Sequence, residues 1–198
     1  GSASEEFTSG LYVKQGVTFT SRGCNNNCDH CLVTGREGRL TTFETFAEGN
    51  IIQDNNFAQC PKEHRMKVYR MLDRQGRAAE FKGGIQASLV TQELADEFKS
   101  IRIHSLFLAC DHNSQREGLK RAVDRLSFLG RNKIYCYTLI GENGQSFGSL
   151  VNDRRRLGFV WESGCMPFAQ LFQPADKWID YHPAWKHIAR TFSRQAAT

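Results

Sequence analysis

Three cysteines lie within the short segment "CNNNCDHC", which covers residues 24–31. Cys24, Cys28 and Cys31 follow the spacing C-x3-C-x2-C. Thiolates are soft ligands that suit zinc or iron–sulfur clusters. A structural zinc ion normally takes four protein ligands, usually from two separated pairs. One curled loop with three thiolates can instead bind three irons of a cubane cluster and leave the fourth iron open. The spacing therefore favours a cluster with an open coordination position.

The residues around these cysteines suit a tightly curled loop. Gly23 precedes the first cysteine, and Asn25–Asn27 separate the first two. Glycine and asparagine adopt left-handed and turn conformations more easily than other residues. We expect them to provide the curvature that a ligand loop needs.

The other cysteines show no ligand spacing. The chain has seven cysteines in all, an odd number without even spacing. This pattern argues against a disulfide framework and indicates a reducing, cytoplasmic setting. We expect the remaining four to be free, buried cysteines: Cys60, Cys110, Cys136 and Cys165.

Short strand patterns alternate with helical patterns through most of the chain. Thr91 and Ser146 are expected to cap two helices, with Phe147 facing inward after Ser146 and Gly158 ending that helix. The strands are expected at residues 16–20, 50–54, 78–84, 103–110, 133–141 and 167–172. The helical patterns cover residues 64–76, 91–101, 119–129, 146–157 and 185–192.

Six strands, each followed by a helix or loop, predict an α/β fold with parallel strands. A complete eight-fold barrel needs roughly 250 residues, and this chain has 198. We therefore expect an open partial (β/α)6 barrel, with a doubly wound sheet as the alternative. Residues 1–10 are interpreted as tag or leader, and residues 11–198 as a single domain. No apolar run reaches the roughly 20 residues that a membrane span requires, so no membrane partner is expected.

Composition adds little to the functional prediction. The formal net charge is +5, which permits a polyanionic partner but is common on solvated surfaces. Arg154–Arg156 form the one compact basic run, and we interpret them as an exposed helix face. His104, His112, His182 and His187 show no ligand pattern.

Polar clusters follow most of the expected strands. Because parallel strands end at one edge of a sheet, these clusters are expected to meet at one active-site mouth. Besides the cysteine loop they are Asp54–Asn56, Gly83–Gln86, Cys110–His112 and Gly141–Asn143.

The cysteine triplet after a first strand, with His30 before the last cysteine, resembles the cluster motif of the radical S-adenosylmethionine (radical SAM) superfamily. That resemblance implies a partial (β/α)6 barrel, a 4Fe-4S cluster on Cys24, Cys28 and Cys31, and S-adenosyl-L-methionine (SAM) on the fourth iron. It further implies reductive cleavage of SAM to a 5′-deoxyadenosyl radical that abstracts a substrate hydrogen. The cofactors then carry the chemistry, while the protein orients them.

The resemblance also suggests residues that contact SAM. His30 stands where the family packs a side chain near the adenine, and Asp111 stands where a polar residue meets the ribose. Asp54, Asn55 and Asn56 replace the family's Gly-Gly-Glu motif, which binds the SAM amino group. "YTLIGENG" (137–144) is similar to the family's fifth-strand segment, so Gly141 carries over as part of the adenine pocket.

The substrate and the reaction type stay open at this stage. The resemblance implies a flavodoxin- or ferredoxin-like electron donor. Modification of RNA or a nucleotide and activation of a partner protein are both compatible with the sequence. The alternative from another class is a non-catalytic zinc-binding interaction module, with His30 or a distant cysteine such as Cys60 as fourth ligand.

Overall fold

Six parallel strands form one open sheet in the computed structural model, which describes residues 14–193. The residues interpreted as tag or leader, 1–10, lie outside the described residues. Every neighbouring pair in the sheet is parallel. Along the sheet the strands are β1 (Val17–Thr18), β4 (Ile51–Ile52), β5 (Ala79–Gln86), β6 (Ile103–Ala109), β7 (Ile134–Ile140) and β8 (Met166–Leu171).

The order of the strands in the sheet is their order in the chain. A doubly wound sheet reverses its strand order at a switch point, and this sheet has no such reversal. The predicted α/β class is therefore confirmed, and the open sheet is consistent with a partial (β/α)6 barrel. The doubly wound alternative is ruled out.

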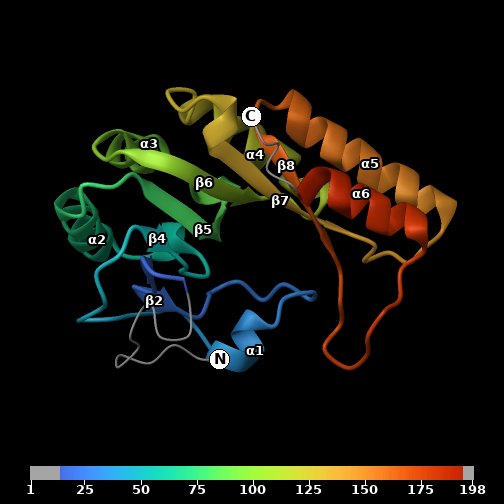
Figure 1. Ribbon diagram of the computed structural model, residues 1–198, viewed down its shortest axis with the longest axis horizontal. Helices are drawn as coiled ribbons and strands as arrows, with labels where there is room; N and C mark the ends of the chain where they lie inside the picture. The colour runs from blue at the N-terminus through green and yellow to red at the C-terminus, as the bar shows by residue number, and fades with distance from the viewer. Residues whose placement is uncertain (1–13, 194–198) are drawn as a thin grey trace.

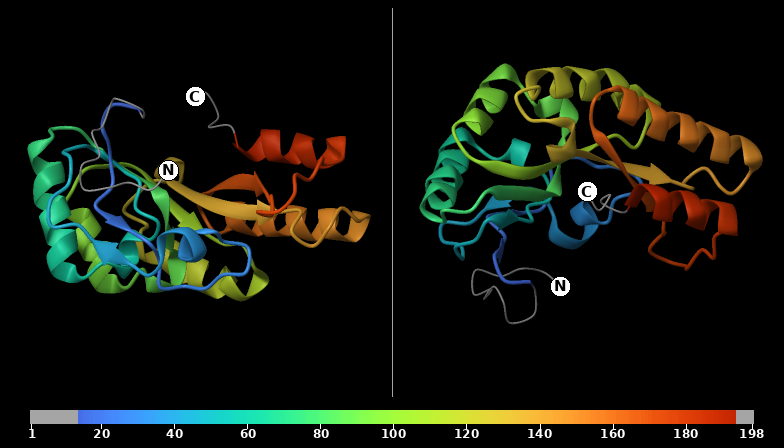
Figure 2. Two further views of the ribbon diagram at one scale, coloured as in Figure 1. Left: turned by 90° about the horizontal axis from the view of Figure 1, so that it is seen from below. Right: turned by 45° about the horizontal axis from the view of Figure 1, so that its top comes forward.

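Four helices cover the outer side of the curved sheet, one after another (Figures 1 and 2). This placement follows from right-handed crossovers between neighbouring parallel strands. The inner side is left to the strand residues and loops that could hold a ligand. The helices are α2 (Lys62–Arg74), α3 (Gln92–Lys99), α4 (Arg116–Arg125) and α5 (Phe147–Glu162).

The main core lies between this helical layer and the sheet. In α3 the apolar residues Leu94, Ala95 and Phe98 fall on one face and are all buried. The predicted caps are confirmed: Thr91 Oγ1 accepts a hydrogen bond from the Leu94 amide at 3.1 Å. Ser146 Oγ likewise accepts one from the amide of Ser149 at 3.1 Å.

Three expectations for α5 are wrong. The helix runs through Gly158 to Glu162, because a single glycine weakens a helix by only about 1 kcal/mol. Phe147, the first helical residue, points to solvent with 81% of its surface exposed. Arg156 is buried rather than exposed, since its guanidinium pairs with Asp153 at 2.7 Å.

The last helix, α6 (Pro183–Ser193), packs against β8 at one end of the sheet (Figure 1). Tyr181, Trp185 and Ile188 form a second core there with Ile140 of β7, Leu157 of α5 and Ala169 of β8. This packing covers the last strand of the open sheet.

Short elements that the sequence pattern did not reveal follow β1. The two-residue strands β2 (Ser21–Arg22) and β3 (Thr41–Thr42) pair antiparallel. Between them lie the cysteine segment and the short helix α1 (Val33–Glu37). The small hairpin therefore holds both ends of the cysteine loop against the sheet.

No helix in the described part of the chain has both the length and the apolar character needed to cross a membrane.

Candidate functional site

A cavity of about 370 Å³ lies where the parallel strands end. This volume falls within the range of small-molecule pockets. Residues of β5, β6, β7 and β8 contribute to its wall. β1 and β4 contribute only through the segments that follow them. The residues that carry the argument below are Cys24, Cys28, His30, Cys31, Asn55, Asn56, Gly83, Gln86, Asp111 and Tyr137.

The cysteine loop reaches this cavity because Gly23 bends the chain sharply after β2. Gly23 has φ of +77°, and a Cβ there would lie 2.2 Å from the carbonyl oxygen of Arg39. Only glycine fits this conformation and this contact. The Cys24 amide then donates to the Gly38 carbonyl at 3.2 Å, and the Cys31 amide donates to the Cys28 carbonyl at 3.0 Å.

The asparagines hold the loop mainly through hydrogen bonds. Within residues 14–193, positive φ values occur only at glycines, so no asparagine is left-handed, although Asn25 lies at a bend of the chain. Asn26 instead donates from Nδ2 to Gln86 Oε1 at 2.8 Å and accepts from Gln59 Nε2 at 3.0 Å. The Asn25 amide donates to Gln59 Oε1 at 2.8 Å. Side-chain amides therefore fasten the cysteine loop to the sheet.

The three thiols face the same cavity and lie close enough to interact. Cys24 and Cys28 are half-buried, and Cys31 is exposed. Burial raises the pKa of the Cys28 thiol, and the neighbouring thiols of Cys31 and Cys24 raise it further. The protein thus gathers soft donors on one side of the cavity.

The sulfurs of Cys24, Cys28 and Cys31 do not all lie within 4.8 Å of one another. In residues 14–193, two groups of three ligand atoms lie within 4.8 Å of one another, and neither contains Cys24, Cys28 or Cys31. Thiolates around one zinc ion at 2.3 Å stand about 3.8 Å apart by tetrahedral geometry. In this structure the three sulfurs are therefore not already at the spacing of one tetrahedral zinc site.

Four of the six predicted SAM-contact residues line the cavity: His30, Asn55, Asn56 and Asp111. Asn55 Nδ2 donates to Glu37 Oε2 at 2.5 Å. Asn56 Oδ1 accepts from the Gln86 amide at 3.2 Å. Their amide groups are therefore held in place at the cavity wall by neighbouring residues.

Asp54 and Gly141 are not among the residues that line the cavity. Asp54 is buried and accepts hydrogen bonds from Thr20 and Ser21. Gly141 lies under Tyr181, whose ring would be 2.5 Å from a Cβ at this position. Both residues therefore contact other parts of the protein behind the cavity wall.

Gly83 and Gln86, from the polar cluster expected at the mouth after the third strand, both line the cavity. The pairing of β5 with β6 shifts register between Phe81 and Ile85, so the two glycines lie at an irregularity of the strand. A Cβ on Gly83 would lie 1.8 Å from the Asp54 carbonyl oxygen. The glycine therefore lets two backbones approach closely beside the cavity.

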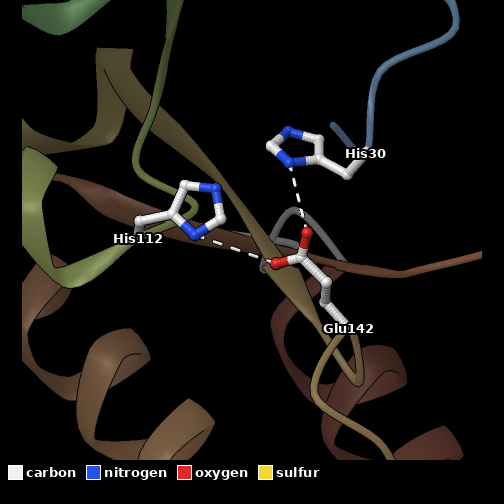
Figure 3. A group of neighbouring side chains, drawn as sticks. All are labelled: His30, His112 and Glu142. Atoms are coloured by element: carbon white, nitrogen blue, oxygen red, sulfur yellow. Dashed lines mark ion pairs between the residues drawn. The ribbon is translucent and has the colours of Figure 1, made fainter. Parts of the chain in front are cut away.

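His30 lies between two carboxylates, Asp111 and Glu142, of which Figure 3 shows Glu142. Its Nε2 is 3.6 Å from Asp111 Oδ2, and its Nδ1 is 3.4 Å from Glu142 Oε1. Hydrogen bonding to Asp111 raises the pKa of His30, burial lowers it, and Glu142 raises it further. Asp111 is itself fixed because its Oδ1 accepts from the Leu139 amide at 2.8 Å.

His112 joins this group, contrary to the sequence-based interpretation. Its Nδ1 lies 3.8 Å from Glu142 Oε2. The sequence shows no ligand spacing for His112 because its neighbours come from other loops. The only available signal was the position of His112 and Glu142 directly after two parallel strands.

The other cysteines are free and buried, as predicted: Cys60, Cys110, Cys136 and Cys165. Cys60 Sγ lies 3.4 Å from Ser21 Oγ, and burial raises the pKa of this thiol to about 12. A thiol of this kind is inert at neutral pH.

The donor set fits a thiolate-bound cluster. The cavity offers three soft sulfur donors on one side and amide, carboxylate and imidazole groups on the others. No protein-family model matches the sequence, and the comparison with curated proteins likewise finds no match.

Proposed function

We propose that this protein is a radical SAM enzyme. The observation that carries the proposal is the placement of the three cysteines: one loop after the first strand of an open parallel sheet presents them to a cavity at the strand ends. Cys24, Cys28 and Cys31 would hold a 4Fe-4S cluster. Bound there, the cluster and SAM supply one-electron cleavage of the sulfonium to a 5′-deoxyadenosyl radical.

The chain's own residues would bind and orient the cofactors. Asn55 and Asn56 offer amide oxygens and nitrogens on one wall of the cavity. Asp111 offers a carboxylate fixed by a backbone amide, which suits sugar hydroxyls. His30 offers a flat ring beside the last cysteine, which suits a nucleobase.

Aromatic side chains stack on one another across β6 and β7, and one of them, Tyr137, lines the cavity. Phe107 stacks on Tyr135 and Tyr137 with ring centroids 4.7 and 4.8 Å apart. The Tyr137 hydroxyl donates to the Lys82 carbonyl at 2.8 Å, so its ring is held in position. Such a stack of rings would exclude water from a reactive radical.

Anaerobic reconstitution tests the proposal. The expected result is brown protein with four irons and four sulfides per chain, which forms 5′-deoxyadenosine after reduction in the presence of SAM. A flavodoxin- or ferredoxin-like protein is the expected physiological reductant. Cys24→Ala should lose both the cluster and the product.

Cys165→Ala is the matched control, because this cysteine is buried away from the loop. It should keep both cluster and product. Colourless protein with one zinc ion and no sulfide would instead support the zinc-binding interaction module.

Two classes of substrate are compatible with this function. RNA or nucleotide modification is compatible with the net charge of +5, and it requires binding that weakens as salt rises. Activation of a partner protein is the other option, and it predicts a stoichiometric radical on that partner after turnover.

A further inference from the structure

We propose that His30, His112 and Glu142 form a site for a divalent transition-metal ion at the rim of the cavity. The site shares His30 with the cysteine loop, but its other two ligands come from the loops after β6 and β7, and its ion is separate from the cluster of the proposed function. Two imidazoles and one carboxylate make up the ligand set, which suits borderline ions such as Zn²⁺, Fe²⁺ or Co²⁺.

The distances fit ligands around a common ion better than direct ion pairs. Glu142 presents Oε1 at 3.4 Å from His30 Nδ1 and Oε2 at 3.8 Å from His112 Nδ1. Hydrogen bonds of this kind are normally 2.7–3.2 Å long. Two ligand atoms bound to one ion at about 2.1 Å stand about 3.4 Å apart in tetrahedral geometry.

One ligand atom is buried without a hydrogen bond. His30 Nδ1 has no hydrogen-bond partner, although its side chain is only 13% exposed. Unpartnered polar atoms are rare in protein interiors and call for an explanation. An ion between the two rings and the carboxylate would satisfy this nitrogen.

The residues behind the site orient His30 as a ligand. Its other nitrogen, Nε2, faces Asp111 Oδ2 at 3.6 Å, and the second oxygen of Asp111 is fixed by the Leu139 amide. Metal-bound histidines commonly direct their second ring nitrogen to a carboxylate in this way. With an ion bound, this arrangement would hold the ring proton on Nε2 and leave Nδ1 to bind the ion.

The two histidine rings converge on Glu142 from different elements (Figure 3). Their centroids are 5.2 Å apart, with planes inclined at 53°. Three protein ligands leave at least one coordination position for water or for an oxygen of a bound molecule. His112 is half-exposed, so the ion could be reached from solvent.

Metal titration of a cluster-free protein tests this site without depending on the proposed function. The full chain with Cys24→Ala, Cys28→Ala and Cys31→Ala removes the competing thiolates, and circular dichroism checks its fold. If that variant folds poorly, the corresponding serine variant replaces it. Co²⁺ is the probe, because its visible spectrum reports coordination and the absence of sulfur ligands.

One equivalent of Co²⁺ should bind with a nitrogen- and oxygen-ligand spectrum. His112→Ala and Glu142→Gln, each added to this background, should lower the affinity at least about tenfold, and Asp111→Asn should lower it about 10–100-fold. His104→Ala is the matched control, because His104 is exposed on β6 and outside the group, and it should bind as tightly as the background.

Two results would overturn the inference: no saturable Co²⁺ binding to the cluster-free protein, or binding that His112→Ala and Glu142→Gln leave unchanged. A failure to form 5′-deoxyadenosine in the reconstituted protein would count against the proposed function alone.

Discussion

Asp54 fastens the end of the first strand, just before the cysteine loop. Its Oδ1 accepts hydrogen bonds from the Thr20 amide at 2.6 Å and the Ser21 amide at 3.0 Å. Its Oδ2 accepts from Thr20 Oγ1 at 2.5 Å, and this hydroxyl also lies 3.0 Å from His64 Nε2. Thr20 and Ser21 are fully buried, so water cannot replace these bonds.

Asp54→Ala should therefore destabilise the protein strongly. It leaves two buried amides without an acceptor, and each such group costs about 1–3 kcal/mol, or about 2–6 kcal/mol together. The Thr20 hydroxyl adds little, because it can turn toward His64 Nε2. Typical domains have only about 5–15 kcal/mol of unfolding free energy, so the loss is a large share of the total.

Asp54→Asn should cost about 1 kcal/mol or less. The amide oxygen can take the place of Oδ1 and accept from both backbone amides, while the NH2 group can donate to Thr20 Oγ1. Burial raises the pKa of the Asp54 carboxyl, so loss of the charge also removes a desolvation penalty.

Urea denaturation with linear extrapolation measures both variants against the parent. The reasoning is refuted if Asp54→Asn proves as damaging as Asp54→Ala, or if Asp54→Ala lies within about 0.5 kcal/mol of the parent. SAM binding to the reconstituted Asp54→Asn protein gives a second readout. We expect no change, since Asp54 is not among the residues that line the cavity.

Three further perturbations test other parts of the structure. Gly83→Ala places a Cβ 1.8 Å from the Asp54 carbonyl oxygen, so it should cost about 1–3 kcal/mol or more in urea denaturation. Burial lowers the pKa of His64 below its ordinary 6.5. The free energy of unfolding should therefore be full above pH 6.5 and fall as the pH drops from there through the lower folded-state pKa. His64→Gln should flatten this part of the plot of stability against pH. Tyr181→Phe removes the hydroxyl that donates to the Phe172 carbonyl at 2.7 Å, and it should lower the thermal midpoint through a loss of about 0.5–1.5 kcal/mol.

Local sequence patterns were enough to predict most of the strands and helices of this protein. The apolar run of β6 and the capped helix after Thr91 are encoded by neighbouring residues, so their positions follow from spacing alone. The end of α5 was not predictable in this way. Its packing against β7 and β8 carries the helix past Gly158, and no local pattern contains that information.

The same distinction between local pattern and tertiary packing applies to the residues of the site. The three cysteines are neighbours in sequence, and spacing alone was enough to single them out. His112 and Glu142 are 30 positions apart, and only the parallel pairing of β6 and β7 brings them together. Asp54 was predicted to contact SAM, because the sequence gives no sign that Thr20 and Ser21, from a different strand end, take up its oxygens.

Because the strands follow one another in chain order, the loop after each strand forms its own part, or sector, of the cavity rim. The helices and the buried strand faces behind the rim are packed together in two cores. Evolution can therefore exchange or lengthen one rim loop at a time and redirect what the molecule accepts. The cysteine hairpin, as the first sector, can stay constant while the later ones diverge.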